Sequence, residues 1–128
     1  MTGKIMRVGL AAALALSLAG AVPAAAKDGD VIRRGSCSAA SDWKLKLSPE
    51  NGKIEVEYEV DSNRVGQTWR VRIVKNGSTI FRGTRRTTAP SGSFEVRIVT
   101  PNTAGRDVFR AVARNVGTGE TCRGSATF

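Results

Sequence analysis

The sequence of 128 residues contains no histidine and only two cysteines, Cys37 and Cys122. Without histidine, the chain lacks the commonest general base, the Ser-His and Cys-His nucleophile arrangements, and the main ligand of zinc sites. The two cysteines do not have CxxC spacing, so a metal-binding or reactive pair is the weaker interpretation. We therefore expect no metal, no cofactor and no enzymatic activity.

Long apolar runs are also scarce, and the one that exists lies at the start of the chain. A short basic segment precedes an apolar stretch at positions 8–21, and an Ala-x-Ala site then ends at Ala26. This layout predicts a signal peptide over residues 1–26, cleaved before Lys27. The stretch is short for a membrane span and no second one follows, so we expect a secreted, extracellular protein with no transmembrane segment in the mature chain.

Export changes the interpretation of the cysteines. In an oxidising compartment, an even pair in a small domain predicts one disulfide, Cys37–Cys122. The loop that it would close covers nearly the whole mature chain, and the chain-entropy model assigns such a closure about 4–5 kcal/mol.

Acidic residues are few: 11 Asp and Glu stand against 20 Lys and Arg. Two of the basic residues lie in the predicted signal peptide, which leaves 18 against 11 and a net charge of +7. Such a charge favours anionic partners, for example wall polymers, acidic lipids, polysaccharides or nucleic acid, and could hold the protein at the cell wall. The alternative is that the charge only keeps an exported protein soluble.

The mature chain has no helical periodicity, and strand-like alternation takes its place. Between residues 53 and 61, apolar side chains alternate with Glu55, Glu57 and Glu59, which is typical of a half-buried strand. Turn signals separate seven such segments: 43–47, 53–61, 67–75, 78–86, 94–99, 107–115 and 121–127. The sequence thus predicts an all-β sandwich of seven strands over residues 41–128, with residues 27–40 as an N-terminal segment tied on by the disulfide.

One stretch carries a resemblance. In Ala104–Asn115, Phe109 is followed by Ala111 and Ala113, and this resembles the sixth strand of immunoglobulin-like and fibronectin type III domains. Trp69 resembles the core tryptophan of the third immunoglobulin strand. The mature chain also resembles a group of small exported actinobacterial proteins of unassigned function.

The resemblance implies a fold and no activity, because this architecture has many functions. It implies that the first, second and fifth strands form one sheet and the other four form the second. Ala111 departs from the cysteine of antibody domains, and Phe109 cannot make the hydroxyl bond of a tyrosine corner. The expected core aromatics are Trp43, Trp69, Phe94 and Phe109.

Carboxylate-pair hydrolysis is the one enzymatic route that the composition leaves open. Glu55, Glu57 and Glu59 would lie about 6–7 Å apart along one face of a strand, a spacing that glycosidases use. The favoured interpretation is a solvated ladder of charges opposite Lys44 and Lys46 on the neighbouring strand.

Two further patterns are weak. Asp28, Asp30, Asp61 and Asn63 lie in turn-like segments, but they lack the spacing of a calcium loop. The triplet at 76–78 fits an N-glycosylation site, and we interpret it as the turn of a hairpin.

The division of charge between the two expected sheets is the strongest functional signal. In the type III order, the outer face of the larger sheet carries arginines and no acid. The predicted anion-binding residues are Arg70, Arg72, Arg82, Arg110 and Arg114, with Arg85 and Arg86 at the edge and Arg123 included if its side chain faces the same way. Arginine forks suit phosphate and carboxylate groups. The alternative is a solubilising face whose arginine stems cover Val74 and Val112.

We therefore predict a non-enzymatic binding module that uses this face for an anionic cell-envelope polymer or an acidic protein. Nucleic acid is not the expected partner, since the protein is exported and no exposed aromatic pair is available for base stacking. The alternative function is a secreted inhibitor or effector that contacts another protein through Thr87–Gly92 or Thr100–Thr103, both of which contain proline.

Overall fold

The structure, a computed structural model, describes residues 29–128, so the predicted signal peptide and Asp28 lie outside the described residues. These residues form strands joined by turns and loops. The strands are β1 (Val31–Ser36), β2 (Asp42–Glu50), β3 (Lys53–Asp61), β4 (Thr68–Lys75), β5 (Ser78–Arg86), β6 (Ser93–Pro101), β7 (Val108–Asn115) and β8 (Thr121–Thr127). Within residues 29–128, no helix is long and apolar enough to cross a membrane.

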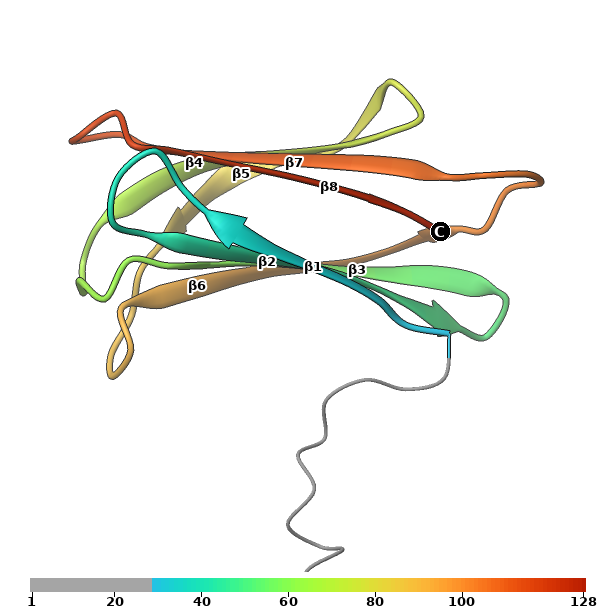
Figure 1. Cartoon of the computed structure of the whole chain (residues 1–128), viewed down its shortest axis with the longest axis horizontal. Helices are drawn as coiled ribbons and strands as arrows, with labels where there is room; N and C mark the ends of the chain where they lie inside the picture. The colour runs from blue at the N-terminus through green and yellow to red at the C-terminus, as the bar shows by residue number, and fades with distance from the viewer. Residues whose placement is uncertain (1–28) are drawn as a thin grey trace, which may run out of the picture.

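The strands form two antiparallel sheets that lie one above the other (Figure 1). One sheet has the order β1-β2-β3-β6 and the other the order β5-β4-β7-β8. The all-β prediction is confirmed, and so is the expected division of the strands between the sheets.

The predicted number of seven strands is wrong, because β1 makes an eighth. It lies in the N-terminal segment and pairs with β2, with Gly35 opposite Trp43 and Arg34 opposite Lys44. Ile32 is half-buried opposite Lys46, and Arg33 is exposed although it is opposite the buried Leu45. Because β1 has no apolar face of period two, its pairing comes from its neighbours and not from its own pattern.

Two hairpin turns follow from backbone preferences. Asn76 and Gly77 have φ values of 48° and 85°, as a two-residue turn between β4 and β5 requires. The hairpin interpretation of this triplet is confirmed. Asn51 and Gly52, with φ values of 49° and 77°, make the same kind of turn between β2 and β3. β2 continues through Glu50 and is therefore longer than the predicted segment 43–47, which leaves only Asn51 and Gly52 for the turn.

The core lies between the sheets and is built as the alternation predicted. Trp69 and Phe109 are fully buried and Phe94 is 6% exposed. The Trp69 and Phe94 ring centroids lie 6.1 Å apart and join β4 to β6 across the sandwich. Tyr58 in β3 donates a hydrogen bond of 2.9 Å to the Cys122 carbonyl in β8, and burial raises the pKa of its phenol.

Trp43 is only partly buried, and it packs at the side of the core where β1 and β2 meet β8. A Cβ atom added at Gly35 in β1 or at Gly124 in β8 would lie 2.7 Å from the indole ring. The ring therefore occupies a slot between two glycines, one from each sheet. No other residue type leaves room for it there, because even a methyl group would overlap the ring.

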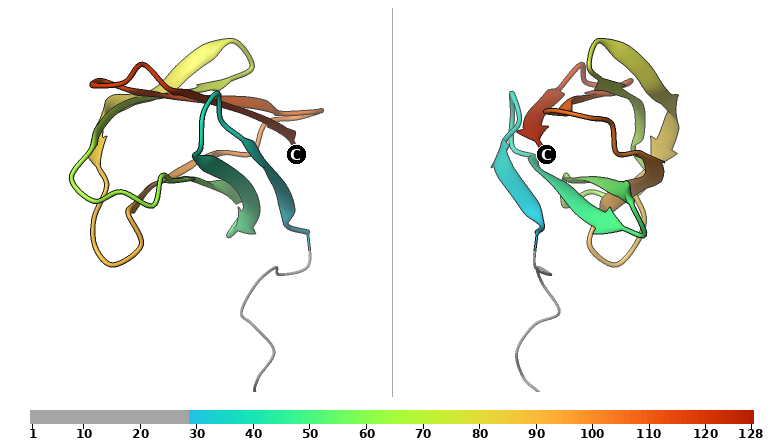
Figure 2. Two further views of the ribbon diagram at one scale, coloured as in Figure 1. Left: turned by 60° about the vertical axis from the view of Figure 1, so that its left-hand side comes forward. Right: turned by 90° about the vertical axis from the view of Figure 1, so that its right-hand side faces the viewer.

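The same side of the sandwich carries the disulfide. Cys37, directly after β1, is bonded to Cys122 in β8 across a sequence separation of 85, as predicted. The Glu120 carboxylate accepts hydrogen bonds from the amides of Ala39 and Ser41, at 3.1 and 2.8 Å, and from the Ser41 hydroxyl. Figure 2 shows β1 beside β8, closing this side of the molecule. The N-terminal segment is thus tied to the last strand, as expected.

Candidate functional site

The two sheets carry very different charges. The strands β4, β5, β7 and β8 contain nine basic residues and no acid: Arg70, Arg72, Lys75, Arg82, Arg85, Arg86, Arg110, Arg114 and Arg123. The strands β1, β2, β3 and β6 contain six basic and seven acidic residues: Arg33, Arg34, Lys44, Lys46, Lys53 and Arg97 against Asp42, Glu50, Glu55, Glu57, Glu59, Asp61 and Glu95. The mixed sheet neutralises itself and the arginine-rich sheet does not.

On the mixed sheet, the charged side chains pair across the strands. Lys44 lies 3.7 Å from Glu59, and Lys46 lies 3.8 Å from Glu57. Glu55, which is 6% exposed, pairs with Arg97 in β6. The predicted ladder is confirmed for Glu57 and Glu59, but not for Glu55, which is buried and opposite Ser48 in β2. Each of the three glutamates is therefore paired with a cation.

One carboxyl on this sheet does not fit the pattern. Glu95 in β6 is opposite Glu59, and the ladder continues from Glu59 to Lys44. Desolvation, together with the charges of Glu57 and Glu59, raises the pKa of the Glu95 carboxyl. Repulsion from these like charges makes Glu95 the least favourably placed carboxyl of a face whose other charges are nearly balanced.

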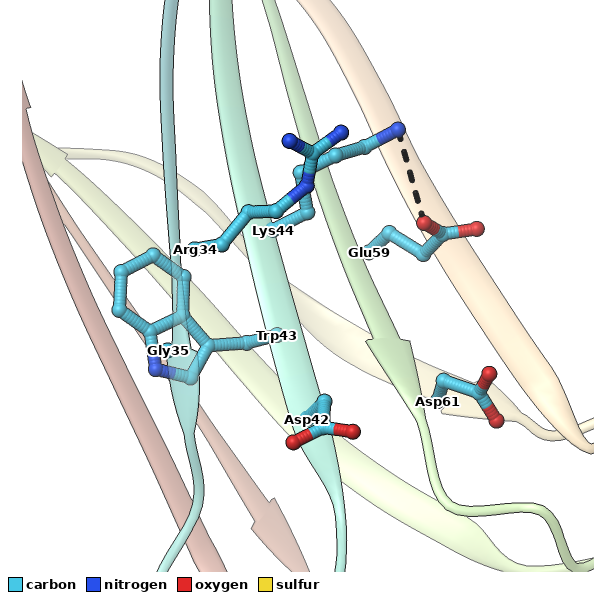
Figure 3. Close-up of a pocket in the computed structure, with 7 residues that line it drawn as sticks. All are labelled: Arg34, Gly35, Asp42, Trp43, Lys44, Glu59 and Asp61. Atoms are coloured by element: carbon cyan, nitrogen blue, oxygen red, sulfur yellow. Dashed lines mark ion pairs between the residues drawn. The ribbon is translucent and has the colours of Figure 1, made fainter.

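A shallow concavity of about 480 Å³ lies on this sheet near its β1 edge (Figure 3). It is lined by Arg34, Gly35, Asp42, Trp43, Lys44, Glu59 and Asp61. Figure 3 shows the Lys44–Glu59 ion pair on one side and the Asp42 and Asp61 carboxylates on the other. Because charges of both signs line it and part of them are paired, this concavity has no strong preference for either sign of ligand.

The other sheet presents the arginine face, which we define as the outward side chains of β4, β5, β7 and β8. The register confirms that Arg70, Arg72, Arg82, Arg110, Arg114 and Arg123 share this face. Arg72 lies directly opposite Arg82 in β5, and Arg70 lies directly opposite Arg114 in β7. Like charges at directly opposed positions destabilise a sheet.

A second concavity of about 480 Å³ opens on the arginine face. Its lining consists of Arg70, Val71, Arg72, Arg82, Gly83, Thr84, Val112, Arg114 and Arg123. Gly83 contributes no side chain and Val112 is half-buried, so the floor is low and partly apolar while the walls are guanidinium groups. Among residues 29–128, no carboxylate forms an ion pair with any of these five arginines.

Three of the predicted anion-binding residues lie outside this concavity. Arg110 is on the arginine face but borders a separate hollow beside Asn76 and Gly77. Arg86 lies at the edge of the sheet, opposite Thr68. Arg85 is opposite the buried Trp69 and therefore faces the other way, where its guanidinium carbon lies 5.0 Å from the Phe81 ring centroid. Arg85 is at the edge, as expected, but it is not part of the arginine face.

Sequence reasoning missed the role of Lys75. It is the one lysine of the arginine-rich sheet and is 8% exposed on the inner side. Its ammonium group donates to the Thr100 hydroxyl at 3.4 Å and to the Pro101 carbonyl. Its position at the end of a strand, next to a turn, gave no sign of this, since the partners come from β6.

One acid that directly precedes a strand of the arginine-rich sheet is also engaged in hydrogen bonds. Asp107, directly before β7, is fully buried and accepts hydrogen bonds from the Thr103 hydroxyl, the Thr103 amide at 3.0 Å and the Asn76 side chain at 2.9 Å. The bond from the Thr103 hydroxyl, more than any other contact, holds the pKa of this carboxyl below its usual range. Asp107 therefore stabilises two loops and is not available to balance the arginines.

Within the part of the chain that the structure describes, no group of three or more His, Cys, Asp or Glu residues could hold a metal ion. Both cysteines are in the disulfide.

No protein-family model matches the chain, and no curated protein matches it at a significant level.

Proposed function

We propose that this chain is an exported, non-enzymatic binding module that holds an anionic cell-envelope polymer on its arginine face. The observation that carries the proposal is the concavity lined by five arginines without a carboxylate partner among the described residues. A field of one sign attracts a polyanion, within a Debye length of about 8 Å at physiological salt. An acidic protein surface would be attracted by the same field.

The fold supports the proposal as a rigid platform. We propose an immunoglobulin-like, type III-like sandwich with an added N-terminal strand, on the basis of the sheet order β5-β4-β7-β8 packed against β2-β3-β6. Because the arginines of the concavity lie on strands and not on loops, their spacing is set by the sheet. A preorganised surface loses less entropy on binding.

The test is co-sedimentation of the purified, oxidised protein with Gram-positive wall sacculi, before and after chemical removal of their anionic polymers, over a salt series. Binding is expected to require the polymers and to weaken steadily as salt rises. Binding that is independent of the polymers, or unchanged at high salt, would overturn the proposal.

A matched pair of variants separates the arginine face from net charge. In the first, Arg70, Arg72, Arg114 and Arg123 are changed to Glu. In the second, the exposed arginines Arg33, Arg34, Arg64 and Arg106 are changed to Glu, which alters net charge by the same amount. We expect the first variant to lose at least about tenfold in affinity and the second to lose much less, since local field and not net charge governs capture. Equal losses would reduce the face to a solubility device.

A second candidate is a protein contact through the loop between β5 and β6. This loop is braced against the loop after β3: the Thr87 hydroxyl donates to the Arg64 carbonyl at 2.5 Å, and the Ser62 amide donates to the Gly92 carbonyl at 3.0 Å. Its tip, with Ala89 and Pro90, is exposed. A braced, exposed loop is suited to act as an inhibitor or effector.

The two candidates differ in their response to salt. A complex made through the loop should survive high salt and be lost when residues 88–91 are replaced by glycine and serine. A complex made through the arginine face should show the reverse behaviour in both measurements.

A further inference from the structure

The arrangement around Val112 narrows the class of ligand. Val112 lies near the middle of the arginine face in β7, opposite Arg72 in β4 and Arg123 in β8. Arg110 and Arg114 are two residues before and after it on the same strand, so they share its side of the sheet. Strands lie about 4.8 Å apart and alternate residues about 7 Å apart. A half-buried apolar side chain is thus surrounded by four arginines, of which Arg72, Arg114 and Arg123 also line the concavity.

All the exposed cations of this sheet are arginines. The only lysine in β4, β5, β7 and β8 is Lys75, which is buried on the inner side. Lysine would supply the same charge for solubility or long-range attraction, but only as a point charge. Arginine adds a planar fork that donates two parallel hydrogen bonds to oxyanions.

The geometry favours an anion that accepts hydrogen bonds from several sides. A carboxylate has two oxygens in one plane, and one or two forks satisfy it. A phosphoryl group offers three acceptor oxygens and as much as two negative charges in a similar volume. Arginines placed on both sides of Val112 across the strands, and on both sides along the strand, match the second kind of group.

Resting on the proposed function, we propose that the concavity recognises phosphoryl groups in preference to carboxylates, with a phosphate of the envelope polymer seated over Val112. The apolar floor excludes water from one side of the anion. On the other sides, the guanidinium groups donate the hydrogen bonds that water would otherwise supply. Arg82 and Arg70 extend the positive field toward β5, where the next phosphate of the polymer lies.

The experiment compares two small probes of similar charge, inorganic pyrophosphate and tricarballylate, by titration calorimetry on the whole oxidised protein. We expect pyrophosphate to bind at least about tenfold more tightly, because several forks bond it at once. Equal affinity, or tighter binding of the tricarboxylate, would overturn the phosphoryl preference.

A variant that keeps the charge separates this inference from the proposed function. Changing Arg72, Arg114 and Arg123 to Lys preserves the field but removes the forks. We expect it to bind wall polymer more weakly but still in a salt-sensitive way, and to lose the preference for pyrophosphate. The matched control, R33K/R34K/R64K, should keep both. If the lysine variant keeps the preference, the phosphoryl inference fails while the polymer proposal stands. If neither the native protein nor any variant binds polymer, the proposed function fails.

A last comparison distinguishes the source of the phosphate. A soluble poly(glycerol phosphate) and vesicles containing phosphatidic acid present the same chemistry, one as a polymer and one as a lipid surface. We expect the polymer to bind and to compete with pyrophosphate. Binding to the vesicles alone would overturn the assignment to a polymer.

Discussion

The two sheets of this protein have the same backbone arrangement but differ in their outer charges, which are mixed in sign on one sheet and all positive on the other. Each has four antiparallel strands with an apolar inner face, and each outer face is crowded with ionisable groups. On the mixed sheet, Lys44, Lys46 and Arg97 pair with glutamates on neighbouring strands. On the arginine face, Arg70 and Arg72 have other arginines opposite them. Folding alone explains the first arrangement. The second is unfavourable for folding, and the anionic ligand that we propose would compensate for the repulsion.

The largest effect should come from the covalent bond that joins the two sheets. Changing Cys37 and Cys122 to Ser removes the closure of a long loop and should lower the free energy of unfolding by about 4 kcal/mol. Urea unfolding of the oxidised protein and the double variant measures this. A loss below about 1 kcal/mol would mean that the hydrogen bonds of Glu120 already hold the sheets together without the disulfide.

The next effect on stability concerns the slot between Gly35 and Gly124, in which the Trp43 ring packs against both sheets. Gly124→Ala places a methyl group against the Trp43 ring and should cost about 1–3 kcal/mol. Ser125→Ala, an exposed neighbour on the same strand, is the matched control and should be near neutral. Thermal unfolding compares the two. Equal stability would show that the indole can move aside without loss.

The third effect on stability concerns Asp107, the carboxylate directly before β7. Since the Asp107 pKa is lowered in the folded state, Asp107 contributes stability above its unfolded pKa of about 3.9, and this is lost as pH falls through the folded pKa. Asp107→Asn should therefore destabilise the protein at pH 7 and flatten the fall in stability below about pH 4. Denaturant titrations at several pH values check this. An unchanged pH profile would contradict the role of Asp107 in the two loops.

The smallest effect is that of reversing one charge, which should change the free energy of unfolding in opposite directions on the two sheets. Lys44→Glu breaks the ion pair with Glu59 and should cost about 0.5–1 kcal/mol. Arg72→Glu replaces repulsion by attraction to Arg82 and should stabilise the protein by about 0.5 kcal/mol. Both changes should shrink in 1 M salt, where the Debye length is about 3 Å. If Arg72→Glu is also destabilising, the arginine face is not electrostatically strained.

Much of this fold could be predicted from the sequence because alternation is a local signal. The bounds of β3, β5 and β8 agree with the predicted segments, and Trp69 and Phe109 lie in the core as expected. The strand β1 could not be found in this way, since its apolar residues Val31 and Ile32 are adjacent and do not alternate with polar ones. Its place is set by its pairing with β2 and by the disulfide to β8, and neither can be read from the residues of β1 itself.

The candidate site could likewise be predicted only as far as local alternation allows. Strand parity predicted that Arg70, Arg72, Arg110 and Arg114 share a face, and the register agrees. The concavity itself is lined by residues of all four strands, among them Gly83 in β5 and Val112 in β7, and nothing local to either residue indicates this. Arg85 was grouped with the anion-binding residues from its neighbourhood in the sequence, but its opposition to Trp69 turns it away.

The Cys37–Cys122 bond also has a consequence for resistance to proteolysis. Seven of the eight strands lie between the two bonded residues or contain one of them, so the described chain is nearly a closed ring. A protease that cuts any one exposed loop within this ring, such as the tip at Ala89 and Pro90, would leave both pieces covalently joined. The sheets would still pair and the arginine concavity would keep its walls. A single nick would therefore show on a gel only after reduction.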